Sequence, residues 1–247
     1  MLELINVSKR YGHLVAIEPT DLLLEAEKTY VLIGPSGCGK STLLKLTIGL
    51  VNSDTGSVRI AGEELADANV LRLRRRIGYV IQDGGLFPHM TARGNVSLVA
   101  RYLGWERNRI DERLDELAEL TQFPRDGLDR YPVQLSGGQQ QRIGLMRALM
   151  LDPDVLLMDE PLGALDPMIR SDLQSDLRGI FRALNKTVIM VTHDLHEAAY
   201  FADEIILLRS GRIIQRGTIT DLVDSPQDPF VTQFVNAQRT TVPGGEL

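Results

Sequence analysis

The sequence has little cysteine and no long apolar run. Its 247 residues include one cysteine, Cys38, so no internal disulfide can form and a reducing, cytosolic setting is the simplest expectation. No apolar stretch approaches the roughly 20 residues that a membrane-spanning helix needs. The N-terminus, Met1-Leu2-Glu3-Leu4, has neither the basic nor the apolar region of a signal peptide. These absences predict a soluble protein that can still dock on a membrane protein.

Basic residues do not predominate either. The chain carries 27 Lys and Arg against 33 Asp and Glu, a formal net charge of −6, which disfavours a general nucleic-acid-binding surface. Any affinity for phosphate must therefore come from a local site. The length suits one large α/β domain, or one domain with a subdomain.

A glycine-rich stretch provides a candidate for such a local site. It follows the apolar residues 30–33 and runs into Leu43-Leu44-Lys45-Leu46, so the pattern predicts a buried strand, a tight loop and a helix. The stretch has the G-x-x-x-x-G-K-[S/T] spacing of a phosphate-binding loop. Its residues are Gly34, Pro35, Ser36, Gly37, Cys38, Gly39, Lys40, Ser41 and Thr42. A plain glycine-rich turn is the alternative, but a chance match in a chain this long is on the order of one in a hundred at average composition.

The chemistry of this loop predicts polyphosphate binding. Glycines let several backbone N–H groups converge on one point, and the start of the following helix adds its positive end. Lys40 would reach the β- and γ-phosphates, and the Ser41 hydroxyl would coordinate Mg²⁺.

Two carboxylates follow another apolar run. Residues 155–158 have the pattern of a buried strand, and Asp159 and Glu160 come directly after it. Taken alone, this is a core strand followed by a polar turn. In a chain with a phosphate-binding loop, Asp159 is predicted to hold Mg²⁺ and Glu160 to polarise the attacking water as general base.

The stretch Leu135-Ser136-Gly137-Gly138-Gln139 predicts a helix start that can also bind an anion. Ser136 and Gln139 have the spacing of a capping box, which by itself explains them as a well-capped helix. A helix N-terminus with two glycines is an anion site as well, so both interpretations can hold. Asp194 and Glu197 have the same capping-box spacing, so they and His196 are interpreted as helix-start structure.

Together these motifs resemble the ATP-binding cassette family, over nearly the whole chain. In family order they are the loop 34–42, Gln82, residues 135–139, residues 155–160, Ala164-Leu165-Asp166 and His193. The resemblance implies an α/β fold with a P-loop NTPase (RecA-like) core, an antiparallel β lobe and an inserted α-helical subdomain. It predicts a single domain over residues 1–239, with the helical subdomain at roughly 83–150 and a flexible tail at 240–247.

The family assigns roles to Gln82, His193, Asp166 and Tyr11, and each of these residues also has a simpler local explanation. Gln82 would touch Mg²⁺, although it could be a surface glutamine at a strand end. His193 would contact the γ-phosphate, although a single histidine after a strand is more often structural. Asp166 would lie at the dimer seam, and locally it is an N-cap before a proline. Tyr11 would stack on adenine, although it could be an ordinary aromatic of a turn over residues 9–12.

The resemblance also implies partners. Two cassettes would meet head to tail around two ATP molecules with Mg²⁺, so that Ser136, Gly137, Gly138 and Gln139 of one copy face the γ-phosphate of the other. The protein would dock on transmembrane permease subunits as a peripheral protein at the cytoplasmic face of the inner membrane. Its relation to a solute-binding protein would be indirect, and nucleic acid is not expected. Residues 83–91 would line the permease groove, unless they are only a turn-rich connector.

Several local stretches resemble the importers of quaternary-ammonium osmoprotectants such as glycine betaine, carnitine or choline. They are residues 77–82, 85–91, 130–132 and 139–142. A different cargo, an amino acid or a phospholipid, would leave the same motifs. A non-transport cassette protein acting on ribosomes or DNA is a third hypothesis, disfavoured by the acidic balance and by the lack of a fused second cassette or coiled coil.

Overall fold

A computed structural model describes residues 1–82, 84–163 and 166–239. The chain divides into two compact units, one formed by Met1–Leu73 with the residues from Thr187 onward, the other by Arg74–Lys186. Asp83, Ala164, Leu165 and the predicted tail 240–247 lie outside the described residues. Within the described ranges, none of the helices combines the length and the apolar character needed to cross a bilayer.

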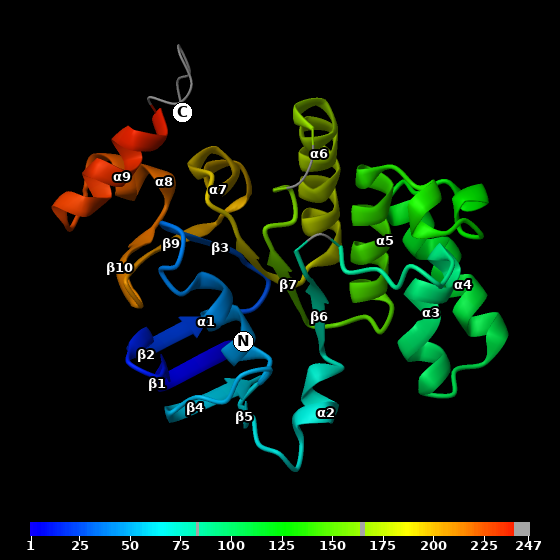
Figure 1. The fold of residues 1–247 in the computed structure, drawn as a ribbon, viewed down its shortest axis with the longest axis horizontal. Helices are drawn as coiled ribbons and strands as arrows, with labels where there is room; N and C mark the ends of the chain where they lie inside the picture. Colours follow the sequence, from blue (N-terminus) through cyan, green and yellow to red (C-terminus); the bar gives the residue numbers. More distant parts are fainter. Residues whose placement is uncertain (83, 164–165, 240–247) are drawn as a thin grey trace. The chain divides into compact units, whose positions relative to one another are not determined.

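The first unit begins with an antiparallel sheet. Its strands are β1 (Leu2–Tyr11), β2 (Leu14–Leu24), β4 (Thr55–Ile60) and β5 (Glu63–Glu64), in the order β2-β1-β4-β5 (Figure 1). Every pair is antiparallel, so the predicted antiparallel β lobe is confirmed.

The predicted turn over residues 9–12 is wrong in its first part. Lys9, Arg10 and Tyr11 each pair with β2, and strand pairing outweighs the local turn preference.

The same unit contains a mostly parallel sheet. Its order is β10-β9-β3-β8, formed by β3 (Thr29–Ile33), β8 (Thr187–Val191), β9 (Glu204–Arg209) and β10 (Arg212–Gly217). Strands β8 and β9 run parallel to β3, and β10 closes the sheet as an antiparallel hairpin with β9. All residues of β3 and β8 are buried, as expected for central parallel strands. Helices α1 (Lys40–Thr47), α7 (Leu195–Phe201), α8 (Ile219–Asp224) and α9 (Pro229–Arg239) complete the unit.

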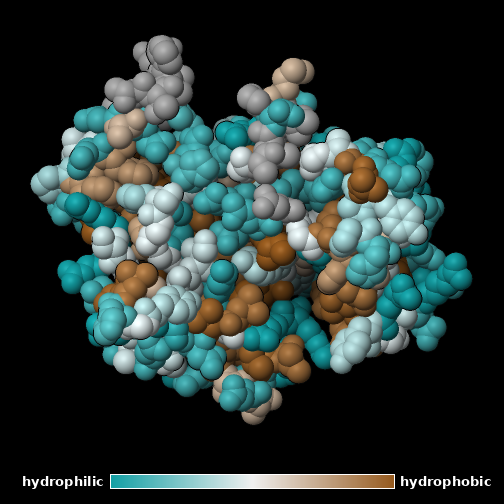
Figure 2. Space-filling model, in the orientation of Figure 1, coloured by the Kyte–Doolittle hydropathy of each residue, from teal (hydrophilic) through white to brown (hydrophobic). Residues whose placement is uncertain are grey.

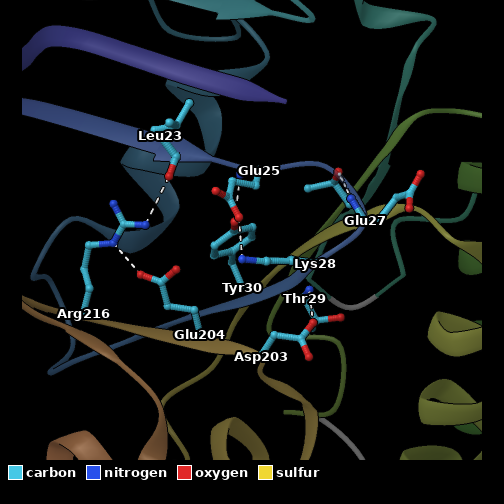
Figure 3. A network of polar contacts seen from close by, with 10 residues as sticks. Leu23, Glu25, Glu27, Lys28, Thr29, Tyr30, Asp203, Glu204 and Arg216 are labelled. Carbon is cyan, nitrogen blue, oxygen red and sulfur yellow. Dashed lines mark hydrogen bonds and ion pairs between the residues drawn. The ribbon is translucent and has the colours of Figure 1, made fainter.

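Polar contacts hold the entrance to β3 in place (Figure 3). Thr29 N donates to a carboxylate oxygen of Asp203 over 2.7 Å, and Glu25 N donates to the Tyr30 hydroxyl over 2.7 Å. Arg216 of β10 donates to Glu204 of β9 at 2.6 Å, within the neighbouring hairpin. It also donates to the Leu23 carbonyl of β2 at 3.1 Å, which joins the hairpin to β2. The strand that leads into the glycine-rich loop is therefore anchored before the loop begins.

The second unit combines two parallel strands with helices. Strands β6 (Ile77–Val80) and β7 (Val155–Asp159) pair in parallel, and the short helix α2 (Val70–Arg74) precedes β6. The longer helices are α3 (Ala92–Tyr102), α4 (Arg107–Leu120), α5 (Gly137–Leu149) and α6 (Pro167–Leu184). The apolar stripe Ile110, Leu114 and Leu117 is buried where α4 packs against α3 and α5. The predicted α/β architecture with a helical region is thus confirmed, whereas the bounds 1–239 and 83–150 stay predictions.

On the face in view in Figure 2, brown hydrophobic areas are interrupted by teal hydrophilic residues. Single exposed apolar residues are normal on a protein surface, so they need no special explanation.

Candidate functional site

The glycine-rich loop of the first unit has the predicted strand–loop–helix geometry. It leaves β3 at Ile33 and enters α1 at Lys40. Gly34, Gly37 and Gly39 have φ angles of 145°, 76° and 111°, a region that side chains disfavour. A Cβ atom at Gly34 would lie 2.2 Å from the Leu208 carbonyl oxygen, and one at Gly39 would lie 2.5 Å from that of Ala16. Glycine is therefore required at both positions by conformation and by space.

One buried lysine brings positive charge to this loop. Lys40 is 6% exposed, and its Nζ donates to the carbonyl oxygens of Gly34 at 2.8 Å and Pro35 at 3.1 Å. The first turn of α1 contains no acidic residue, so nothing on that turn offsets the positive helix end. Ser41 follows Lys40 in the same turn. The loop is thus equipped to bind an anion with several charged oxygens.

His193 lies at the same sheet edge as the loop. It follows β8, which runs parallel to β3, and Thr192 N donates to the Leu32 carbonyl over 3.2 Å. The His193 side chain is exposed, and its backbone carbonyl accepts a hydrogen bond from Gln238 of α9 at 3.2 Å. The carboxyl ends of two neighbouring parallel strands therefore carry the loop and the histidine, which is the usual location of a ligand site in α/β sheets.

The helix start after His193 differs from the predicted capping box. Asp194 caps α7 by accepting from His196 N at 2.7 Å and Glu197 N at 3.4 Å, as expected. The Glu197 carboxylate does not return to the Asp194 amide, because it accepts from the Thr192 hydroxyl at 2.5 Å. The Thr192 oxygen accepts from Asp194 N at 3.1 Å instead. A threonine that sequence reasoning did not single out thus links the end of β8 to α7.

Tyr11 ends β1 with 48% of its surface exposed. The Lys9 ammonium lies 5.7 Å from the ring centroid. The ring is accessible for stacking, and the adenine contact itself stays a prediction.

In the second unit, Gln82 and Asp159 lie at one sheet edge. Asp159 is the last residue of β7 and is 6% exposed, whereas Gln82 follows the parallel neighbour β6 and is exposed. The Tyr79 hydroxyl lies 3.5 Å from Asp159 Oδ2. Burial, together with the charge of Asp159, raises the pKa of Tyr79 to about 12. Tyr79 therefore stays protonated beside the carboxylate, a contact that the strand pattern alone could not indicate.

Glu160 has an unusual backbone conformation. Its φ angle is 47°, in the left-handed region that residues other than glycine seldom adopt. Its carbonyl accepts a hydrogen bond from Gly163 N at 3.2 Å, which closes a tight turn. Seven other described non-glycine residues also have a positive φ, and Ala61 and Ser210 among them lie in plain hairpin turns, so the role of Glu160 as base stays a prediction.

The predicted capping box at the start of α5 is present. Ser136 Oγ accepts from Gln139 N at 3.3 Å, and Gln139 Oε1 accepts from Ser136 N at 3.0 Å. Ser136 and Gly137 are exposed, and the first turn of α5 holds no acidic residue. A cavity of about 260 Å³ lies beside this helix start, and its lining includes Gly138, the basic Arg142 and the acidic Asp172. The start of α5 is thus both capped and open to an anion.

Asp166 occupies the predicted N-cap position before Pro167 at the start of α6, but its side chain makes no capping hydrogen bond. Its two predecessors in the motif lie outside the described residues. Its place at a dimer seam stays a prediction.

Each unit thus contributes a different part of the candidate chemistry. The loop and His193 belong to the first unit, and Gln82, Asp159, Glu160 and the α5 start belong to the second.

Comparisons with known proteins agree with these motifs. A family model described as ABC transporter matches residues 17–163. The choline transport ATP-binding protein OpuBA of Bacillus subtilis is 46% identical over 240 residues, which cover 97% of this chain and 63% of that protein. The glycine betaine uptake system ATP-binding protein YehX of Escherichia coli is 47% identical over 234 residues, covering 95% and 76% of the two chains. This chain thus spans a little under two thirds of the length of the Bacillus relative.

Among solved structures, a dimeric post-hydrolysis state of the ATP-binding cassette MJ0796, bound to ADP and Pi, superposes with a TM-score of 0.79. The two chains are 32% identical, and the match covers 89% of this chain and 99% of that one.

Proposed function

Because the chain belongs to the ABC transporter family, we propose that it is the ATP-hydrolysing subunit of an importer for quaternary-ammonium osmoprotectants such as glycine betaine or choline. The observation that carries the ATPase part is the loop between β3 and α1, with glycines at positive φ and Lys40 held inside it. The cargo rests on the names of the relatives, which transport choline and glycine betaine.

The nucleotide would be bound by the first unit. The loop N–H groups and Lys40 bind the β- and γ-phosphates, and Tyr11 stacks on the adenine ring. Four further residues of the same loop would surround the phosphates, namely Pro35, Ser36, Cys38 and Thr42. His193, at the neighbouring strand end, contacts the γ-phosphate.

The predicted metal ligands suit Mg²⁺ chemically. They are the Ser41 hydroxyl, the Gln82 amide oxygen and the Asp159 carboxylate, all hard oxygen donors of the kind that Mg²⁺ prefers. These side chains would hold Mg²⁺, which supplies charge neutralisation at the phosphate oxygens when bound. The Tyr79 hydroxyl lies 3.5 Å from a carboxylate oxygen of Asp159 at the end of β7.

Glu160 acts as general base in this proposal. Its carboxylate takes a proton from the attacking water, and Glu160 follows directly after Asp159, the last residue of β7. Phosphoryl transfer requires mainly positioning and charge stabilisation. A general base next to the proposed metal ligand Asp159 is therefore sufficient for ATP hydrolysis.

A second copy of the chain would complete each site. Ser136 and Gly137 are exposed at the positive end of α5, where they can receive the γ-phosphate held by a partner. Gly138 and Gln139 belong to the same helix start, and Asp166 lies at the seam. The similar cassette MJ0796 is described as dimeric with ADP and Pi, which supports this arrangement.

Permease subunits would dock on the second unit, which would make the protein peripheral at the cytoplasmic face of the inner membrane. A largely apolar cavity of about 490 Å³ there is lined by Ile81, Phe87 and Val99, among others. Phe87 is 42% exposed, yet its backbone is bonded in both directions to the fully buried Asn95 of α3, at 2.7 and 3.1 Å. Arg147 donates to the carbonyls of Gly84 and Gly85 at 2.8 Å each. An exposed aromatic ring that lines an apolar cavity, on a firmly held backbone, supports a docking role for residues 84–91.

Uptake of labelled glycine betaine and choline at high osmolarity tests the function. The host strain lacks the gene for this chain and also lacks the other transporters of these solutes. It is complemented with the wild-type gene or with Glu160→Gln. We expect uptake with wild type alone, which would establish ATP-driven import of an osmoprotectant. Equal uptake in both strains would contradict the import of osmoprotectants and would leave another cargo, such as an amino acid or a phospholipid. A chain without ATPase activity would contradict the whole proposal.

A further inference from the structure

The turn between β9 and β10 lies directly behind the phosphate-binding loop. Gly211 N donates to the Cys38 carbonyl at 2.9 Å, and the Gly211 carbonyl accepts from Glu18 N of β2 at 2.9 Å. One residue thus joins the loop to the β lobe by two backbone hydrogen bonds. We propose that Gly211 is a positioning residue for ATP binding, which holds the loop in its phosphate-binding shape. This inference rests on the proposed nucleotide-binding function.

The peptide unit between Cys38 and Gly39 explains how such a bond can act on a phosphate. The peptide bonds of the described residues are trans, so the carbonyl and N–H of one unit point in opposite directions. The Cys38 carbonyl points at Gly211, so the Gly39 N–H points away from the turn, and the proposal places the phosphate on that side. Holding the carbonyl therefore aims the N–H donor before the nucleotide arrives.

Backbone contacts on both sides leave the loop little freedom to shift. A Cβ atom at Gly34 would lie 2.2 Å from the Leu208 carbonyl oxygen of β9. Cβ atoms at Gly39 and Gly211 would lie 2.5 and 2.9 Å from the same Ala16 carbonyl oxygen of β2. Loop, hairpin and β2 are thus packed backbone against backbone, and displacement of the hairpin would be transmitted to the loop.

The hairpin shape alone offers a simpler explanation of Gly211. Ser210 and Gly211 have φ angles of 48° and 78°, as in the two-residue turn that matches the twist of a hairpin. By that account Gly211 matters for folding and not for nucleotide binding. The two accounts differ in what a side chain at this position would do to ATP affinity.

Gly62 offers a matched control in the same unit. It lies in the turn between β4 and β5 with a φ of 82°, and a Cβ atom there would meet nothing within 4 Å. Gly62→Ala therefore introduces the same backbone strain as Gly211→Ala without displacing anything. Gly211→Asn is a second variant, because asparagine tolerates positive φ but still brings a Cβ against Ala16.

The test measures the dissociation constant for Mg·ATP by calorimetry, together with KM and kcat of the ATPase, in the full chain. For both Gly211 variants we expect binding roughly tenfold weaker, the effect of losing about one hydrogen bond, with KM raised and kcat nearly unchanged. Gly62→Ala should bind Mg·ATP as wild type does, although its thermal stability falls.

Each outcome decides one question. Unchanged affinity in Gly211→Asn, or a loss of kcat with unchanged affinity, would reduce Gly211 to a hairpin glycine and overturn the inference. If Gly211→Ala fails to fold, Gly211→Asn alone decides. If wild type itself binds no Mg·ATP, the proposed function fails, and that result is distinct from the first.

Discussion

At the scale of single residues, Glu160 carries the clearest test of the chemistry. Replacing its carboxylate by an amide keeps the size of the side chain but removes the base, so Glu160→Gln should bind Mg·ATP normally. Turnover should fall by roughly 10²- to 10⁴-fold, the usual contribution of a general base. Phosphate release under saturating ATP measures this, with calorimetry confirming that binding is retained. Turnover near wild type would remove Glu160 as the base.

We expect Lys40 to contribute to nucleotide binding rather than to proton transfer. Lys40→Ala deletes the ammonium that the loop carbonyls hold at 2.8 and 3.1 Å, so Mg·ATP affinity should fall by roughly 10- to 100-fold, as for lost charged hydrogen bonds. Lys45 of the same helix is exposed, and Lys45→Ala is the matched control. Equal affinity in the two variants would mean that Lys40 does not reach the phosphates.

Tyr11 is the residue whose role rests most on resemblance. If its exposed ring stacks on adenine, Tyr11→Ala should weaken ATP binding by roughly tenfold, the effect of losing one stacked base, with near-normal maximal turnover. Tyr11→Phe keeps the ring and should bind as wild type. An unchanged affinity in Tyr11→Ala would leave only the role of a strand-end aromatic.

At the scale of elements, the contact between β6 and α5 depends on a glycine. A Cβ atom at Gly78 would lie 2.5 Å from the Ala148 carbonyl oxygen of α5, so Gly78→Ala should lower the free energy of unfolding by about 1–3 kcal/mol. Gly179, exposed on α6 with nothing within 4 Å, is the control. Gly179→Ala should instead raise stability by about 0.5–1 kcal/mol through helix propensity. Urea unfolding of both variants measures the two signs, and a neutral Gly78→Ala would contradict the close packing.

Elements also show where local patterns succeed and where they fail. The capping box of α5 is local, and it was predictable because Ser136 and Gln139 contact each other within one turn. At α7 the same spacing failed, because Thr192 at the end of β8 competes for the Glu197 carboxylate. The strand β1 runs through the predicted turn at Lys9 because β2 pairs with it.

At the scale of the whole molecule, the proposed dimer can be tested by a substitution that leaves the fold of the single chain intact. Aspartate caps a helix as well as serine does, but it places a negative charge at the α5 start. In a Glu160→Gln background, Mg·ATP should drive dimerisation, and Ser136→Asp should abolish it because the charge opposes the partner's γ-phosphate. Ser136→Asn, a neutral cap, is the control. Sedimentation velocity with and without Mg·ATP measures the outcome, and a dimer that persists in Ser136→Asp would exclude this helix start from the interface.

The sequence by itself determined the local geometry that depends on neighbours along the chain. The phosphate-binding loop, the carboxylates after residues 155–158 and the cap at Ser136 are each defined within a few residues, where turn geometry and helix capping act. Only the tertiary structure decided which distant backbone supports them. Gly211 lies behind Cys38, and Tyr79 lies beside Asp159, because strand pairing brings together segments whose own patterns carry no sign of each other.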